Sequence, residues 1–244
     1  MPERILPGAQ AVVKFNNKMF GVLLLHGFAG NPSEYKYLIQ RCEDEKFSYY
    51  APRYPGHGTS ADNMDLTAAH DWSVCAREAY IELSSHCDRV YVIGHSIGAC
   101  FAVNIANEFN PEKTVLISMP VDTNAYNSQF IKNRKSEMKT RYINDPEESL
   151  KYTGYNSGIP AKKQTDLIKI IRQTLKSLPN FHTDVLIFQS VHDEIISHDS
   201  ADLVYDSIIS IRKQKIMLEN SAHIIMLDYD RDVLADRIFS FLKD

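Results

Sequence analysis

The sequence predicts an α/β fold with a mainly parallel central sheet and helices on both of its faces. Short apolar runs alternate along the chain with longer amphipathic runs, and this alternation is typical of such a fold. The length of 244 residues suits one hydrophobic core with one insertion. One interval between two strand-like runs is far longer than the others, which indicates where the insertion lies.

The chain opens with two strand-like runs, at 12–15 and 20–25, separated by Asn16-Asn17-Lys18. Asparagine-rich turns between such runs favour a β-hairpin, so we expect these two strands to pair. We expect the further strands at 47–52, 89–93, 114–118, 184–189 and 213–218, helices at 32–45, 67–85, 97–109 and 163–178, and a loop rich in Pro, Gly, Ser, Asp and Asn at 53–66.

The long interval spans residues 119–183, between the strands that end near Ser118 and begin near Asp184. It exceeds what a single crossover helix requires. We therefore predict a core formed by 1–118 and 184–244, and a small helical cap insertion with its flanking crossover at 119–183. The apolar stripe of the helix expected at 163–178 belongs to this insertion.

Composition and charge exclude several classes of protein. The formal net charge of −4 and the isoelectric point near 6.1 give no reason to expect nucleic acid as a partner. No apolar run approaches the roughly 20 residues that span a bilayer, and the first ten residues contain no apolar signal core. We therefore expect a cytoplasmic protein. The histidines lack the spacing of a zinc site, so we expect no metal and no cofactor.

A candidate nucleophile lies in Gly94-His95-Ser96-Ile97-Gly98, which fits the pattern G-x-S-x-G. The apolar run VYVI precedes it and a helix-forming run follows it, so Ser96 is expected at a sharp strand-to-helix turn. Such a turn strains the backbone of the serine, and small neighbours make room for it. The following helix directs N–H groups and its positive end toward a developing oxyanion, with Ile97 contributing the first amide.

A serine hydroxyl needs a base, and that base needs an orienting carboxylate. His223 follows the last predicted strand, and Asp193 and Glu194 follow the strand before it, so all three lie at the same sheet edge as Ser96. His198 is a second candidate base in the segment after Asp193. Spacing favours His223 over His198 but does not separate the two adjacent acids.

The backbone N–H of Phe28 is the second candidate oxyanion donor. The buried run Leu23-Leu24-Leu25 leads into His26-Gly27, and an amide just after such a turn can meet that of Ile97 above Ser96. The alternative is a tight turn with a hydrogen-bonded histidine and no chemical role. A second glycine-rich loop, at 54–58, is interpreted as a structural turn.

With these residues assembled, the sequence resembles bacterial carboxylesterases and monoacylglycerol lipases of the α/β-hydrolase superfamily. The resemblance covers nearly the whole chain through LLLHGFAGNPSEY, APRYPGHGTSADNM, VIGHSIGA, QSVHDEIIS and NSAHIIMLD. It implies the α/β-hydrolase fold, Ser96 as nucleophile, Asp193 as acid and His223 as base. It also implies an oxyanion hole formed by the amides of Phe28 and Ile97. On this resemblance Asp193 is preferred to Glu194.

Two residues depart from the family pattern. Members often carry leucine before the serine and a glycine pair two residues after it, where this chain has His95 and Gly98-Ala99. Neither departure removes a catalytic group. His95 is expected to change the surroundings of the serine turn, and Ala99 to loosen the contact of helix and sheet slightly.

The resemblance implies a small-molecule ester as substrate, with a small to medium acyl chain or a monoacylglycerol. Apolar residues expected to line an acyl pocket are Phe28, Ile131, Met138, Ile170 and Ile171. A thioesterase or a carbon–carbon-bond hydrolase would use the same three residues on another substrate. A non-catalytic binding protein is the alternative from a different class, and the presence of all three residues disfavours it.

Overall fold

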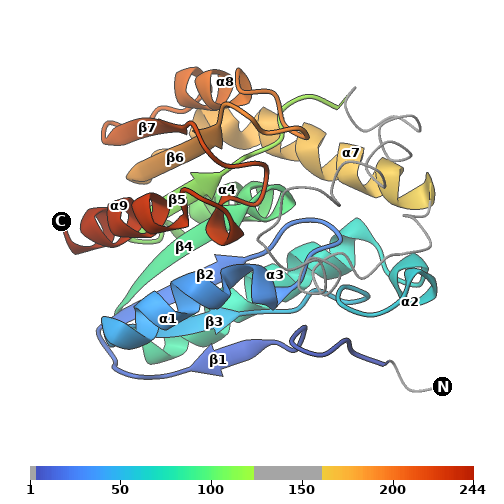
Figure 1. The fold of residues 1–244 in the computed structure, drawn as a ribbon, viewed down its shortest axis with the longest axis horizontal. Coiled ribbons are helices and arrows are strands. Elements are labelled where there is room, and N and C mark those ends of the chain that lie inside the picture. Colours follow the sequence, from blue (N-terminus) through green and yellow to red (C-terminus); the bar gives the residue numbers. More distant parts are fainter. Residues whose placement is uncertain (1–3, 124–160) are drawn as a thin grey trace.

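The computed structural model describes residues 4–123 and 161–244 (Figure 1). Within these residues the strands are β1 (Val12–Lys14), β2 (Phe20–Leu25), β3 (Ser48–Ala51), β4 (Arg89–His95), β5 (Lys113–Ile117), β6 (Val185–Ser190) and β7 (Lys213–Leu218). They form one sheet in the order β1-β3-β2-β4-β5-β6-β7. β1 is antiparallel to β3, and the other neighbouring pairs are parallel.

Helices cover both faces of the sheet, as Figure 1 shows. The α-helices of the described residues are α1 (Lys36–Asp44), α2 (Ala61–Asp65), α3 (Ala69–His86), α4 (Ile97–Phe109), α7 (Ala161–Ser177), α8 (Ser200–Ser207) and α9 (Arg231–Lys243). Short 3-10 helices are η1 (Pro32–Tyr35), η3 (Leu178–Asn180) and η4 (Ile225–Leu227). Buried residues of α3, α4, α7 and α8 share one apolar cluster, and those of α1 and α9 share another.

Strand β2, in the interior of the sheet, shows how both faces are buried. Leu23 and Leu25 contribute to the cluster of α3 and α4, whereas Val22 and Leu24 contribute to that of α1 and α9. Side chains alternate between the faces of a strand, so an uninterrupted apolar run is needed when both faces are covered. The predicted α/β fold with a mainly parallel sheet is confirmed.

Two local predictions were wrong. β1 and β2 do not form a hairpin, because β3 lies between them and pairs with both. The asparagine turn is present, and Asn17 Oδ1 accepts hydrogen bonds from the N–H groups of Met19 and Phe20, but it directs the chain past β3 instead of back along β1. The segment 53–66 also contains the short helix α2, which starts where the side chain of Ser60 accepts a hydrogen bond from the N–H of Asn63.

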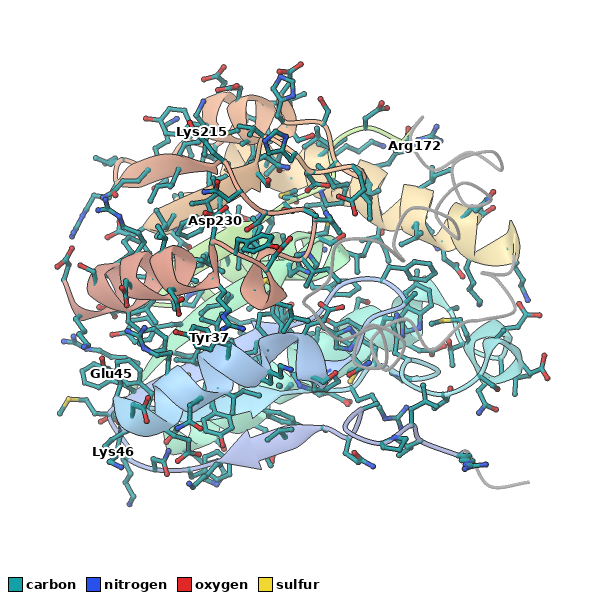
Figure 2. All side chains as sticks on the ribbon, viewed as in Figure 1. Tyr37, Glu45, Lys46, Arg172, Lys215 and Asp230 are labelled. Atoms are coloured by element: carbon teal, nitrogen blue, oxygen red, sulfur yellow. The ribbon has the colours of Figure 1, made fainter. Side chains whose placement is uncertain are left out.

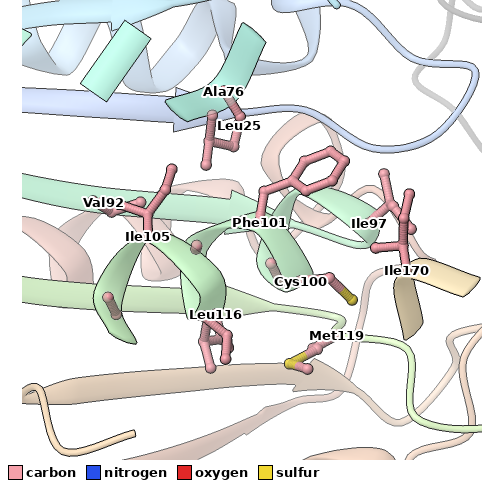
Figure 3. Close-up of a cluster of buried hydrophobic side chains, with 14 of the residues drawn as sticks. Leu25, Ala76, Val92, Ile97, Cys100, Phe101, Ile105, Leu116, Met119 and Ile170 are labelled. Carbon is pink, nitrogen blue, oxygen red and sulfur yellow. The ribbon is translucent and has the colours of Figure 1, made fainter. Parts of the chain in front are cut away.

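Helix α7 is the longest described element of the interval at 119–183. It packs along α4 and also contacts α3. Leu167, Ile170 and Ile171 are buried in the same cluster as α4, so this helix forms part of the crossover from β5 to β6. Figure 3 labels Ile170 in this cluster. None of the helices in the described parts of the chain is both long and apolar enough to cross a membrane.

Candidate active site

Ser96 lies between the end of β4 and the start of α4 in a strained conformation. Its φ of 54° and ψ of −121° place a residue with a side chain in a region that glycine alone tolerates easily. Its N–H donates to the carbonyl oxygen of Ile117 at the end of β5 (2.9 Å), and its own carbonyl accepts from Ala99 (2.9 Å). The turn is therefore held by the neighbouring strand and by the first turn of the helix.

Two glycines allow the backbone to approach this closely. A Cβ atom at Gly98 would lie 1.9 Å from the carbonyl oxygen of Leu25, and one at Gly94 would lie 2.3 Å from that of Gly98. These contacts are with backbone atoms, which cannot move aside as a flexible side chain can. Ala99, one of the two departures from the family pattern, is fully buried in the core.

His223 and Asp193 form a buried pair at the carboxyl edge of the sheet. Nδ1 of His223 lies 3.0 and 2.8 Å from the two carboxylate oxygens of Asp193, and both side chains are almost fully buried. The N–H at Nδ1 donates to the carboxylate, which fixes the orientation of the ring and its tautomer.

The surroundings of Asp193 favour the ionised form of its carboxylate. Its Oδ1 accepts hydrogen bonds from the N–H groups of Ile195 and Ile196, both at 2.9 Å, and its Oδ2 accepts from Nε2 of Gln189 at 3.0 Å. Burial raises the pKa of Asp193, but the charge and hydrogen bond of His223 and these two amides outweigh burial and hold the pKa at about 2.

The two competing candidates occupy different places. Glu194 is exposed, and its carboxylate accepts a hydrogen bond from the backbone N–H of His223 (3.2 Å) instead of meeting the imidazole. His198 is exposed and pairs with its neighbour Asp199 (3.0 Å). Of the two histidines, the one that the structure brings to Asp193 is thus His223.

The loop that carries His223 is anchored by two further carboxylates. Asp228 accepts from the N–H of Ala222 (2.8 Å), and Asp230, labelled in Figure 2, accepts from the hydroxyl of Ser221 (2.9 Å). The hydroxyl of Ser190, at the end of β6, donates to the carbonyl oxygen of Ser221. His223 is therefore held on a loop with a fixed backbone.

His95 connects the serine turn to this loop. Its ring centroid lies 4.7 Å from that of His223, and its Nε2–H donates to the carbonyl oxygen of His223 (3.2 Å). Because His95 immediately precedes Ser96 in the chain, this contact links the strained turn to the backbone of His223. The hydroxyl of Ser118 donates to the same carbonyl oxygen (3.4 Å).

The loop that begins at Gly27 orients the amide of Phe28. The carbonyl oxygen of Gly27 accepts hydrogen bonds from Nδ1 of His26 (2.9 Å) and from the N–H of Gly30 (3.2 Å). Since a peptide group is planar and trans, fixing this carbonyl also fixes the Phe28 N–H that points the opposite way. The Ile97 amide lies in the first turn of α4, where helices leave N–H groups without partners inside the helix.

Two histidines lie close to Phe28, His26 before it in the chain and His57 against its ring. Nε2 of His26 accepts from the N–H of Tyr54 (3.4 Å), and burial lowers the pKa of His26 to about 4. The hydrogen-bonded histidine that was the alternative interpretation of this turn is therefore present beside the oriented amide. The Phe28 ring contacts the rings of His57 and Trp72, and burial lowers the pKa of His57 as well.

Three of the residues expected to line an acyl pocket lie in the described part of the chain. Phe28, Ile170 and Ile171 are all buried, and Ile170 of α7 belongs to the same cluster as Ile97 of α4 (Figure 3). Ile131 and Met138 lie outside the described residues. Within residues 4–123 and 161–244, no group of three or more His, Cys, Asp or Glu side chains has the arrangement of a metal site.

Sequence reasoning missed Glu34 and Gln189. Glu34 is buried against His95, with its Oε2 3.0 Å from Nδ1 of that histidine. These two residues are 61 positions apart, so no local motif joins them. The one available signal was His95 itself, because a polar ring in a buried turn requires partners.

With this geometry described, comparison with known proteins places the chain in a family. Residues 22–237 match the model of the alpha/beta hydrolase family, and the chain belongs to that family. It is 29% identical to a thermostable monoacylglycerol lipase of Bacillus sp. (strain H-257), covering 97% of this chain and 95% of the relative. It is 26% identical to a carboxylesterase of Bacillus subtilis (strain 168), over 91% and 92% of the two chains.

A solved structure gives the same result. The fold matches that of a metagenome-derived lipolytic enzyme, from work on LipS and LipT, with a TM-score of 0.85 and 25% sequence identity. The match covers 98% of this chain and 99% of that one.

Proposed function

We propose that this chain is a serine hydrolase that cleaves carboxylic esters through an acyl-enzyme. Ser96 acts as nucleophile, His223 as general base and Asp193 as the carboxylate that orients the base. The observation that supports this most directly is the buried contact of His223 Nδ1 with both oxygens of Asp193, beside the strained turn of Ser96. The names of the two Bacillus relatives agree with it.

The chemistry follows from the roles of these groups. His223 takes the proton of the Ser96 hydroxyl as the oxygen attacks the ester carbonyl carbon, and the amides of Phe28 and Ile97 donate to the oxyanion that forms. The carbon–oxygen bond of the ester then breaks, and His223 passes the proton to the leaving alcohol. Water, deprotonated by the same histidine, then attacks the acyl carbon. The bond from that carbon to Ser96 Oγ breaks, the acid is released, and His223 returns the proton to Oγ. The ionised Asp193 stabilises the imidazolium in both halves of the cycle.

The substrate class rests on the relatives and on the apolar surroundings of the site. We place small to medium acyl esters and monoacylglycerols within it, with the interval 119–183 as the segment that selects the acyl group. The described end of that interval, α7, contributes Ile170 to the cluster that contains Ile97, the residue after the nucleophile. An acyl chain buried against such residues gains up to about 0.8 kcal/mol per methylene.

Replacement of Ser96 tests the proposed function. Ser96→Ala should lower kcat by roughly 10⁶-fold, as expected when a triad serine is removed. A fluorophosphonate should modify the wild-type protein on the Ser96 peptide, as read by mass spectrometry. Modification of another serine, with Ser96→Ala still active, would show the assignment to be wrong. A panel of acetyl to dodecanoyl esters, monoacylglycerols and an acyl thioester then separates esterase from thioesterase activity.

A further inference from the structure

Glu34 is a buried carboxylate that has no part in the chemistry proposed above. Its side chain is 3% exposed, and buried carboxylates are rare unless a partner compensates them. It lies in η1, directly after the loop of Phe28, and that loop closes around it. A Cβ atom at Gly30 would lie only 1.6 Å from Oε1 of Glu34, so the loop and the carboxylate are packed together without space for a larger residue.

One oxygen of Glu34 contacts two segments of the site. Oε2 accepts a hydrogen bond from the N–H of Gly27 (3.1 Å) and lies 3.0 Å from Nδ1 of His95. The opposite nitrogen of His95 faces the carbonyl oxygen of His223 (3.2 Å). These contacts therefore link the loop of Phe28, through Glu34 and His95, to the backbone of His223.

The hydrogen bonds determine where protons lie between Glu34, His95 and the carbonyl oxygen of His223. A carbonyl oxygen only accepts, so Nε2 of His95 must carry a hydrogen. Oε2 of Glu34 and Nδ1 of His95 must then share a second proton, because neither can bind the other without one. Burial opposes ionisation of Glu34, but the hydrogen bond and charge of His95 outweigh it and lower the pKa of Glu34.

We propose that Glu34 and His95 are a positioning pair that holds the three reacting parts of the active site in register. The inference deepens the proposed function and rests on it. Glu34 fixes the peptide group before the donor amide of Phe28. His95, the residue before Ser96 in the chain, fixes the carbonyl group of His223. A small displacement of any of these parts separates nucleophile, base and oxyanion donor, and misplacement by about 1 Å can cost about 100-fold in rate.

Glu34→Gln is the sharpest single change, because it keeps the size of the side chain. An amide oxygen at the position of Oε2 still accepts from Gly27, but a neutral His95 has no proton to give it at Nδ1. An amide nitrogen there donates to His95 but faces the N–H of Gly27. One contact is lost in either case, so we expect kcat to fall about 10- to 100-fold with KM within about twofold of the wild type.

A double variant separates positioning from stability. Glu34→Leu with His95→Leu replaces the buried pair by apolar side chains, a change that is often neutral or stabilising for a fold. It removes the hydrogen bonds to Gly27 and to His223. A positioning role predicts a protein that still unfolds cooperatively but has a kcat that remains about 10- to 100-fold low. A merely structural role predicts that kcat recovers together with stability.

The measurement compares kcat and KM for 4-nitrophenyl butyrate, with kcat referred to sites counted by fluorophosphonate titration. Titration restricts the result to folded molecules, so partial unfolding of a variant does not lower kcat. Glu108→Gln is the matched control, because Glu108 is exposed and pairs with Arg77 (2.6 Å) at the far end of α4. We expect its kcat to remain that of the wild type.

The outcomes distinguish this inference from the proposed function. A kcat within about twofold of the wild type in Glu34→Gln, or in the folded double variant, would overturn the positioning role, since misplacement of the reacting groups has a larger effect. If Ser96→Ala were inactive while these variants kept full kcat, only the inference would be wrong. If Ser96→Ala retained turnover and labelling, the proposed function itself would be wrong.

Discussion

At the scale of single residues, two adjacent acids contact the same histidine through different atoms. Asp193 binds the ring at Nδ1, whereas Glu194 binds the backbone N–H of His223. Asp193→Asn is expected to lower kcat/KM by roughly 10⁴-fold, because an amide favours the wrong tautomer of the base.

Glu194→Gln is the control for that substitution. The amide oxygen of glutamine still accepts the backbone N–H of His223, so kcat/KM should stay within about tenfold of the wild type. Circular dichroism of both variants establishes that the fold is intact. If Glu194→Gln were the more damaging change, the acid would have to be reassigned.

The pH dependence of the reaction follows from the same pair. The pKa of Asp193 is held at about 2, so this carboxylate stays ionised throughout the range in which the protein is assayed. Protonation of the base is then what limits activity on the acid side. We expect kcat/KM to fall as the pH decreases, with one apparent ionisation in the histidine range of about 6–7. A profile that stays flat from about pH 5 to 8, with a substrate for which chemistry limits the rate, would contradict a histidine base.

Local patterns suggest candidate site residues that follow strands and give no sign of contacts between distant segments. Ser96 and His223 could be proposed as candidates because each lies just after a β-rich run, and the carboxyl ends of parallel strands share one edge. Glu34 could not, because its partner His95 is 61 positions away and the contact involves a single oxygen atom. Contacts of this kind depend on how loops close in three dimensions, which local patterns do not encode.

At the scale of secondary-structure elements, α7 stabilises the fold through one face. Ile171 is fully buried against the cluster of α4, while Lys169 on the same helix is exposed. Ile171→Ala leaves a cavity in a packed core and should lower the free energy of unfolding by about 2–5 kcal/mol. Lys169→Ala should change it by less than about 0.5 kcal/mol. Urea unfolding of both variants measures the difference, and equal midpoints would show that α7 is not part of the core.

Element boundaries were predictable where local signals agreed with the tertiary partners. The helix expected at 97–109 and the strand expected at 213–218 have those bounds in the structure, because a strained turn and a change of periodicity mark their ends. The hairpin of 12–15 and 20–25 failed because strand pairing is non-local, and β3 competed successfully for both partners.

At the scale of the whole molecule, buried histidines make stability depend on pH. His26 titrates near 4 in the fold and near 6.5 when unfolded, so between these values the unfolded chain binds more protons. Its contribution is fully present above pH 6.5 and is lost as the pH falls toward 4. The loss amounts to up to about 3 kcal/mol. His57, whose pKa burial also lowers, acts in the same direction.

Urea unfolding at pH 7, 5.5 and 4.5 measures this dependence. His26→Gln has no ionisable group at this position, so its free energy of unfolding should vary less with pH than that of the wild type, even if it is lower at pH 7. Parallel curves for the two proteins would show that His26 does not carry the effect.

The edge of the sheet at β7 affects whether copies of this protein associate by pairing their strands. β7 ends the sheet in the described part of the molecule, and two exposed isoleucines, Ile209 and Ile211, lie just before it. Lys213 and Lys215 lie on the strand itself, the latter labelled in Figure 2. Nζ of Lys213 donates to the carbonyl oxygens of Tyr205 and Ile208, and Lys215 pairs with Asp202. Both charges are thus held at this edge, where lysine side chains disfavour pairing with a strand from another molecule. The lysines thus oppose the growth of an intermolecular β-sheet at this edge, next to the exposed isoleucines. This matters most while a newly made chain is still folding.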